Sequence, residues 1–134
     1  PVGCVYFYEP EVQEKVVKLG LTTKEKIKRD YSIAGIALFV PILFLVPAMV
    51  YFINGARGFW EVFIQITLIL WAMGLFDRIF IDWYWVGKTK AWIIPGTEEL
   101  MPYIPPKTLI KKWVGTIIGY PILAAILSGV ISLI

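Results

Sequence analysis

Residues 59–90 read FWEVFIQITLILWAMGLFDRIFIDWYWVGKTK, and this stretch decides the fold. It contains an uncharged run over residues 62–76 that is long enough to cross most of a bilayer as a helix. Asp77, Arg78 and Asp82 then follow, while the residues between and after them stay apolar or aromatic. Ionisable residues at membrane depth are costly, so a cluster of this kind indicates a functional site.

The aromatic residues around this run predict how deep the charged residues lie. Trp60 and the Trp-Tyr-Trp run at 83–85 would mark the two interfaces, where such side chains gather. A bilayer core takes about 20 helical residues, which puts Asp77 and Arg78 about one turn inside the far boundary and Asp82 at it. Arg78 and Asp82 are i,i+4 neighbours that can pair. In an α-helix Asp77 points away from the face that Arg78 and Asp82 share. It therefore needs a partner from another helix, a loop, a headgroup or water.

The composition supports a membrane protein. The chain has 134 residues, of which 58% are hydrophobic, and its mean hydropathy is +0.72. It has no histidine and a single cysteine, Cys4, which excludes an internal disulfide and Ser-His-Asp or Cys-His catalysis by this chain alone. No metal site is predicted and the cofactor is unknown, although carboxylate chemistry with or without Mg²⁺ stays open.

We therefore predict an all-α integral membrane protein whose residues 1–134 form a single membrane domain. The predicted elements are an interfacial amphipathic helix at 10–20, transmembrane helices at 31–54, 59–86 and 110–134, and a Pro-rich cytoplasmic loop at 87–107. Pro41, Pro47 and Pro121 lie inside predicted spans, where proline bends a helix more often than it breaks it.

The residues before the first span are compatible with more than one local structure. Residues 1–8 suit a strand-like or interfacial anchor, or a disordered start. The helix at 10–20 carries an apolar face that either lies on a membrane surface or packs on the protein's own loops. Thr22 and Glu25 match a capping box, and Thr97 is placed to cap one helical turn in the loop.

Lysine and arginine counts predict the orientation. Only Arg57 lies between the first two spans, whereas eleven basic residues lie before the first span or around the second loop: Lys15, Lys18, Lys24, Lys26, Lys28, Arg29, Lys88, Lys90, Lys107, Lys111 and Lys112. The positive-inside rule puts the N-terminus and the long loop in the cytoplasm and the C-terminus outside the cell membrane. Topology thus explains the basic residues, and nucleic-acid binding is disfavoured.

Small residues on the third span indicate close helix packing. Gly115 and Gly119 form a GxxxG pair, and Gly129 falls near the same face. Three helices have few ways to shield Asp77 from lipid. We therefore expect a homo-oligomer or a subunit of a membrane complex.

The polar residues of the second span and the loop are the candidate site. They are Asp77, Arg78, Asp82, Lys88, Lys90, Glu98, Glu99 and Tyr103. A purely structural role is one interpretation, in which Arg78 and Asp82 pair and the lysines contact lipid phosphates. The favoured functional interpretation is a cytoplasm-side pocket that is covered by the loop and binds an anionic lipid or a phosphorylated small molecule.

Two other functions remain open from the sequence. An interfacial enzyme would use the carboxylates as a general base or as Mg²⁺ ligands. The layout of three spans and an amphipathic N-terminal helix resembles bacterial diacylglycerol kinase in architecture alone, and no residue carries over. A small oligomeric transporter or channel is the third hypothesis, although the first and third spans offer almost no polar residues at mid-depth.

Overall fold

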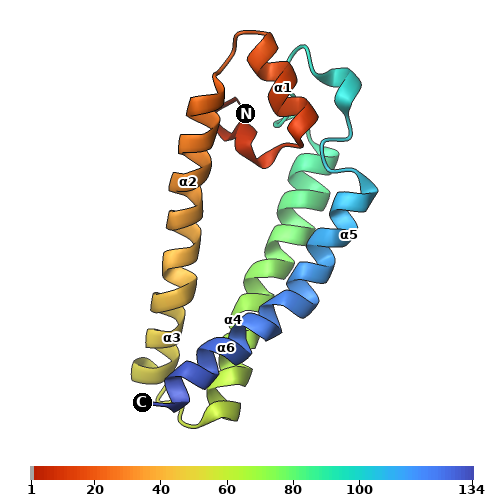
Figure 1. The fold of residues 1–134 in the computed structure, drawn as a ribbon. Coiled ribbons are helices and arrows are strands. Elements are labelled where there is room, and N and C mark those ends of the chain that lie inside the picture. The colour runs from red at the N-terminus through yellow and green to blue at the C-terminus, as the bar shows by residue number, and fades with distance from the viewer. Residues whose placement is uncertain (1) are drawn as a thin grey trace.

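The computed structural model describes residues 2–134, and within them every regular element is a helix (Figure 1). Segments labelled α are α-helical, and those labelled η are 3-10 helices (η1, η5) or π-helices. In chain order the elements are η1 (Val2–Phe7), α1 (Pro10–Lys18), α2 (Lys24–Val40), η2 (Pro41–Leu45), α3 (Val46–Ala48), η3 (Met49–Ile53), α4 (Phe59–Phe76), η4 (Asp77–Val86), η5 (Glu98–Leu100), α5 (Pro106–Val114), η6 (Gly115–Gly119) and α6 (Tyr120–Ser132).

Consecutive elements join into three long helices. The first long helix is Lys24–Ile53, the second Phe59–Val86 and the third Pro106–Ser132, and each is long and apolar enough to span a membrane. The prediction of three such helices is confirmed. The first and third long helices extend beyond the predicted spans at their N-terminal ends. Residues 24–30 add about two turns before the span predicted from 31, and residues 106–109 add about one turn before the span predicted from 110.

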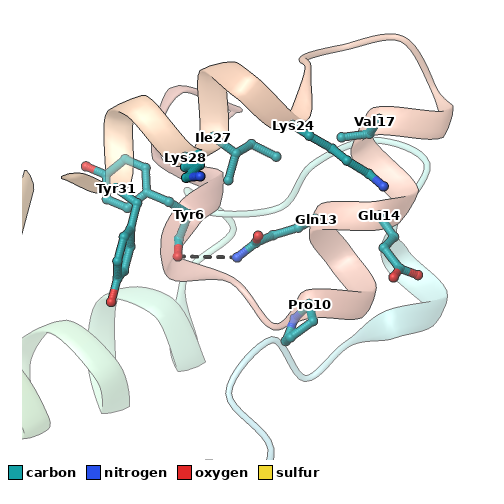
Figure 2. A pocket seen from close by; sticks show the side chains of 9 residues that line it. All are labelled: Tyr6, Pro10, Gln13, Glu14, Val17, Lys24, Ile27, Lys28 and Tyr31. Atoms are coloured by element: carbon teal, nitrogen blue, oxygen red, sulfur yellow. Dashed lines mark hydrogen bonds between the residues drawn. The ribbon is translucent and has the colours of Figure 1, made fainter. Parts of the chain in front are cut away.

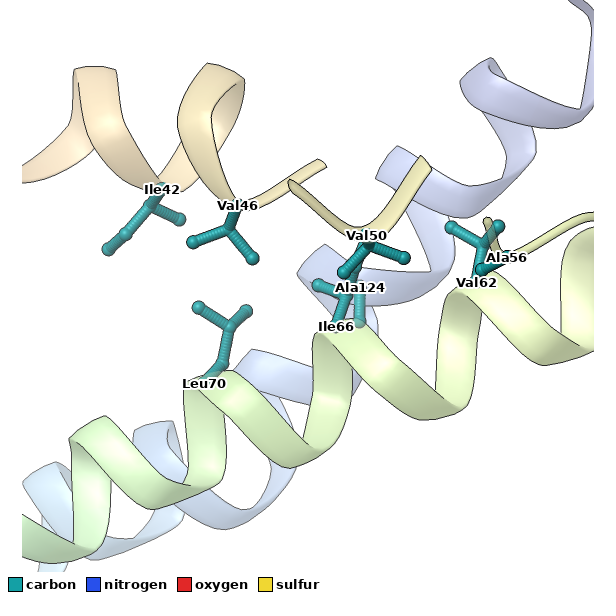
Figure 3. Close-up of a cluster of buried hydrophobic side chains, with 8 residues drawn as sticks. All are labelled: Ile42, Val46, Val50, Ala56, Val62, Ile66, Leu70 and Ala124. Atoms are coloured by element: carbon teal, nitrogen blue, oxygen red, sulfur yellow. The ribbon is translucent and has the colours of Figure 1, made fainter. Parts of the chain in front are cut away.

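The second and third long helices pack closely against each other. A Cβ at Gly74 would lie 2.4 Å from Thr116 Cγ2 and 2.8 Å from a ring carbon of Tyr120, so only glycine fits at this crossing. The first long helix joins the other two through a buried apolar cluster at the end farther from α1 (Figures 1 and 3). Its members are Ile42, Val46, Val50, Ala56, Val62, Ile66, Leu70 and Ala124.

The other half of the first long helix stands apart from the second and third (Figure 1). Between Ile27 and Ile42, none of its residues is buried. Its N-terminal end instead packs on the short helix η1. The first long helix therefore contacts the other two through the buried cluster.

Prolines inside these helices are accommodated without a break. Pro41 and Pro47 lie within the continuous helix Lys24–Ile53, and Pro121 within Pro106–Ser132, as predicted. Each helix contains a π segment beside its prolines, η2 and η3 in the first and η6 in the third. Local changes of helical geometry are one way in which a membrane helix tolerates proline.

Residues 2–23 and 87–105 together form a small compact unit, which we call the head. Its core comprises Val5, Tyr8, Val12, Val16, Ile94 and Tyr103, and Ile27 from the first turn of α2 packs with them. The apolar face of α1 packs here, so the interpretation that α1 packs on the protein's own loops is confirmed. Its core residues Val12 and Val16 are thereby unavailable to a membrane surface.

Three local expectations in the head need correction. Val2–Phe7 forms short 3-10 turns that meet at a kink at Cys4, with Val5 buried, rather than a strand or a disordered segment. Its role as an interfacial anchor stays a prediction, and Pro1 lies outside the described residues. The cap of the first long helix is Thr23, whose side chain accepts a hydrogen bond from the Lys26 amide at 3.2 Å, so the Thr22–Glu25 box is not used. Thr97 makes no cap bond, because its hydroxyl donates to the Ile94 carbonyl.

Candidate functional site

The second long helix changes from α to π geometry at Asp77. The π segment η4 runs from Asp77 to Val86, and its residues that line a large cavity follow a period of four: Asp77, Arg78, Ile81, Asp82, Trp85 and Val86. An α-helix turns about 100° per residue, which would put residues 77 and 86 on opposite sides. The π turn brings them to one side, so Asp77 faces the same cavity as Arg78 rather than pointing away. π segments are frequent at functional sites.

Asp82 holds two cations at the wall of this cavity. Arg78 Nε lies 2.7 Å from Asp82 Oδ2, which confirms the predicted pair. The Nε–H bond is not directed at the oxygen, so the contact is ionic rather than a straight hydrogen bond. Lys112 Nζ, from α5, lies 3.5 Å from the same carboxylate. Arg78 also donates from Nη1 to the Thr116 hydroxyl at 3.3 Å, which ties it to the third long helix.

Burial differs across this cluster. The Asp82 side chain is 4% exposed, that of Arg78 is 14% exposed and that of Lys112 is 35% exposed. The carboxylate is therefore enclosed, whereas Lys112 keeps room for another partner. The Asp77 amide donates within its helix, but among residues 2–134 no group makes a hydrogen bond or ion pair with the Asp77 carboxylate. Asp77 thus lines the cavity as a carboxylate without a protein partner.

The cavity has a volume of about 1020 Å³ and three distinct walls. The first long helix supplies a largely apolar wall, and the charged residues of η4 and α5 supply the second. The head closes the third side with aromatic and apolar side chains. The residues of the apolar wall include Ala34, Ile36, Leu38, Phe39, Val40 and Leu43. Those of the head are Tyr6, Phe7, Tyr8, Trp92, Tyr103 and Ile104.

Hydroxyl groups of the head are occupied by internal contacts. Tyr8 donates to the Trp92 carbonyl, and burial raises the pKa of the Tyr8 phenol, which keeps it protonated. The Tyr103 hydroxyl accepts from the Ile94 amide at 3.1 Å and contacts the Thr97 hydroxyl at 2.8 Å. Tyr103 lines the cavity as predicted, but its polar atom supports the head rather than facing a ligand.

Four of the proposed site residues lie outside the cavity. Lys88 sits 5.5 Å from the centre of the Trp83 ring, and Lys90 is exposed. Glu98 accepts a hydrogen bond from the Gly96 amide at 2.8 Å. Glu99 pairs with Lys15 at 3.3 Å, and a bond from its own amide together with Lys15 lowers the pKa of its carboxyl.

The sequence interpretation missed Lys112, which replaces Lys88 and Lys90 beside the cluster. The sequence does indicate that Lys112 and Thr116 share one face of the third long helix, because they are four residues apart. That position was attributed to topology alone.

A second, smaller cavity of about 440 Å³ lies on the other side of η1 (Figure 2). It is lined by α1, η1 and the first turns of α2, and includes Glu14, Lys24 and Lys28. Gln13 crosses it and donates to the Tyr6 carbonyl at 3.4 Å. Tyr6 and Tyr31 line both cavities, so the two adjoin at these rings.

The glycines predicted to pack helices are open within this chain. A Cβ added at Gly115, Gly119 or Gly129 would meet nothing within 4 Å. The close approach inside the chain occurs at Gly74 instead. Packing of the three glycines against a second chain stays a prediction.

The described residues contain no group of three His, Cys, Asp or Glu side chains placed to hold a metal ion. No protein-family model, curated protein or solved structure matches the chain.

Proposed function

We propose that this protein spans a membrane and binds a phosphate-bearing lipid in the large cavity. The phosphate would lie at Arg78 and Lys112, and an acyl chain would lie along the apolar wall of the first long helix. One observation carries this proposal: a single cavity joins a buried ion cluster to the apolar side of a helix long enough to span a membrane.

The residues present suit such a headgroup. Arginine offers a planar set of N–H donors that matches phosphate oxygens, and lysine supplies a compact charge. Arg78, Lys112 and Asp82 together carry a net charge of about +1, since one carboxylate faces two cations. The volume of about 1020 Å³ is at the upper end of ligand cavities, which supports a ligand with a headgroup and part of an acyl chain.

Enzymatic carboxylate chemistry has less support. Glu98 and Glu99 lie on the head outside the cavity, and Asp82 is occupied by two cations. Of the four carboxylates considered for a general base or for Mg²⁺, Asp77 and Asp82 line the cavity and the two glutamates do not, so the four are not gathered in one place.

We expect binding of a phospholipid to depend on Lys112 and not on its neighbour Lys111. Lys112→Gln removes a charge that faces the cavity, whereas Lys111→Gln removes the same charge from an exposed position outside it. A charge-assisted hydrogen bond contributes about 1.5–3 kcal/mol, so Lys112→Gln should weaken binding roughly tenfold or more. Native mass spectrometry in detergent, with phosphatidylglycerol and phosphatidylethanolamine of identical acyl chains, measures this.

Diacylglycerol with the same chains is the control ligand, because it lacks the phosphate. Its binding should be weaker and should not respond to Lys112→Gln. Equal effects of the Lys111 and Lys112 substitutions, or equally tight binding of diacylglycerol, would disprove the proposal.

We further propose that the head lies in the cytoplasm and that the turn between the first and second long helices faces outward. The imbalance of lysine and arginine supports this orientation. In a Cys4→Ser background, an impermeant maleimide added to intact cells should label Asn54→Cys and leave Lys90→Cys unlabelled. Both positions are exposed. The reverse labelling pattern would refute this orientation.

A further inference from the structure

Asp77 is the charged group of the cavity that the proposed phosphate does not explain. Arg78 and Lys112 each contact Asp82, whereas the Asp77 carboxylate lines the same cavity without an ion pair or hydrogen bond within residues 2–134. A headgroup that carries only negative charge would satisfy Arg78 and Lys112. It would also bring its charge close to the Asp77 carboxylate, which it would repel.

We infer that the lipid headgroup carries an ammonium group as well as a phosphate, and that Asp77 binds the ammonium. This inference rests on the proposed function and names the class of lipid. The phosphate would face Arg78 and Lys112, and the ammonium would face Asp77. A headgroup with both charges leaves every ionic side chain of the cavity with a partner of opposite sign.

The chemistry of Asp77 favours a primary ammonium over a quaternary one. A carboxylate accepts hydrogen bonds, and a primary ammonium has three N–H donors. A trimethylated ammonium has none and is recognised mainly by the faces of aromatic rings. The aromatic residues of the head make contacts with one another, as Tyr8 does with Trp92 and Tyr103. Phosphatidylethanolamine is therefore the ligand that we assign.

The experiment compares phosphatidylethanolamine, its mono- and dimethylated forms, phosphatidylcholine and phosphatidylglycerol, all with the same acyl chains. Binding to the complete chain is measured by native mass spectrometry in one detergent. We expect phosphatidylethanolamine to bind about tenfold tighter than phosphatidylglycerol, with affinity falling at each methylation. Asp77→Asn should bring the ratio of the two affinities close to one, because it removes the charge and keeps the side-chain size.

Glu25→Gln is the matched control, because Glu25 is an exposed acid on the first turn of α2 that lines neither cavity. It should leave the preference unchanged. Circular dichroism checks that Asp77→Asn keeps the helical content of the wild-type chain.

Failures of the inference and of the proposed function are distinguishable. A wild-type preference for phosphatidylglycerol, with binding still sensitive to Lys112→Gln, would overturn the role of Asp77 and leave phospholipid binding intact. A preference for phosphatidylethanolamine that survives Asp77→Asn would also overturn that role. Insensitivity of both lipids to Lys112→Gln would overturn the proposed function itself.

Discussion

Replacing Arg78 and Asp82 together with apolar residues should destabilise the protein less than replacing either residue alone. Asp82 is enclosed at 4% exposure and Arg78 at 14%, so a single substitution leaves a buried charge without its 2.7 Å partner. Breaking a buried pair in this way costs about 3–5 kcal/mol, whereas an apolar replacement of both members is often close to neutral. We expect Arg78→Met and Asp82→Leu each to approach the larger cost.

The double-mutant cycle of these two substitutions measures the coupling, with the free energy of unfolding taken from denaturation in mixed detergent micelles. Lys112 contacts the same carboxylate but is 35% exposed, so it can turn toward water or a lipid phosphate when Asp82 is lost. Strictly additive losses would contradict the idea that Arg78 and Asp82 stabilise each other.

Gly74→Ala should loosen the contact between the second and third long helices. The added methyl group would lie 2.4 Å from Thr116 Cγ2 and 2.8 Å from the Tyr120 ring, distances at which atoms must move. Overpacking of this kind costs about 1–3 kcal/mol. The displacement also moves Thr116, which accepts a hydrogen bond from Arg78, so lipid binding at the cavity should weaken as well.

Gly119→Ala is the control, because the same methyl group would meet nothing within 4 Å there. It should leave the free energy of unfolding nearly unchanged in the monomer. Adding Thr116→Ser to Gly74→Ala removes the closest clashing atom and should recover part of the loss. Equal stability of the Gly74 and Gly119 variants would show that the two helices do not cross at Gly74.

Hydropathy and local spacing are sufficient to predict much of this structure. Long uncharged runs, such as 31–56, 62–76 and 113–134, have few alternatives to a spanning helix, so the three long helices follow directly from the sequence. The Arg78–Asp82 pair also follows, because residues four apart are neighbours in a helix. Both predictions depend only on residues close in sequence.

The features that depend on distant contacts were not predicted. The π geometry of η4, which turns Asp77 toward the cavity, has no reliable local signal. Lys112 joins Asp82 across 30 residues of sequence, and that pairing depends on how α5 lies against η4. The packing of α1 was left open for the same reason, since an apolar helix face fits a membrane surface and a protein core equally well.

The separation of the first long helix from the other two has a consequence for how a lipid would compete for the cavity. In the membrane-spanning arrangement that we propose, a ligand that enters between these helices would come from the membrane, where every bulk lipid is both solvent and competitor. Occupancy then follows the mole fraction of the preferred lipid rather than its concentration in water. Under that condition a site needs little absolute affinity. The arrangement of charges at Asp77, Arg78 and Lys112 would then decide which lipid dissociates slowly and which exchanges rapidly with the bulk lipid.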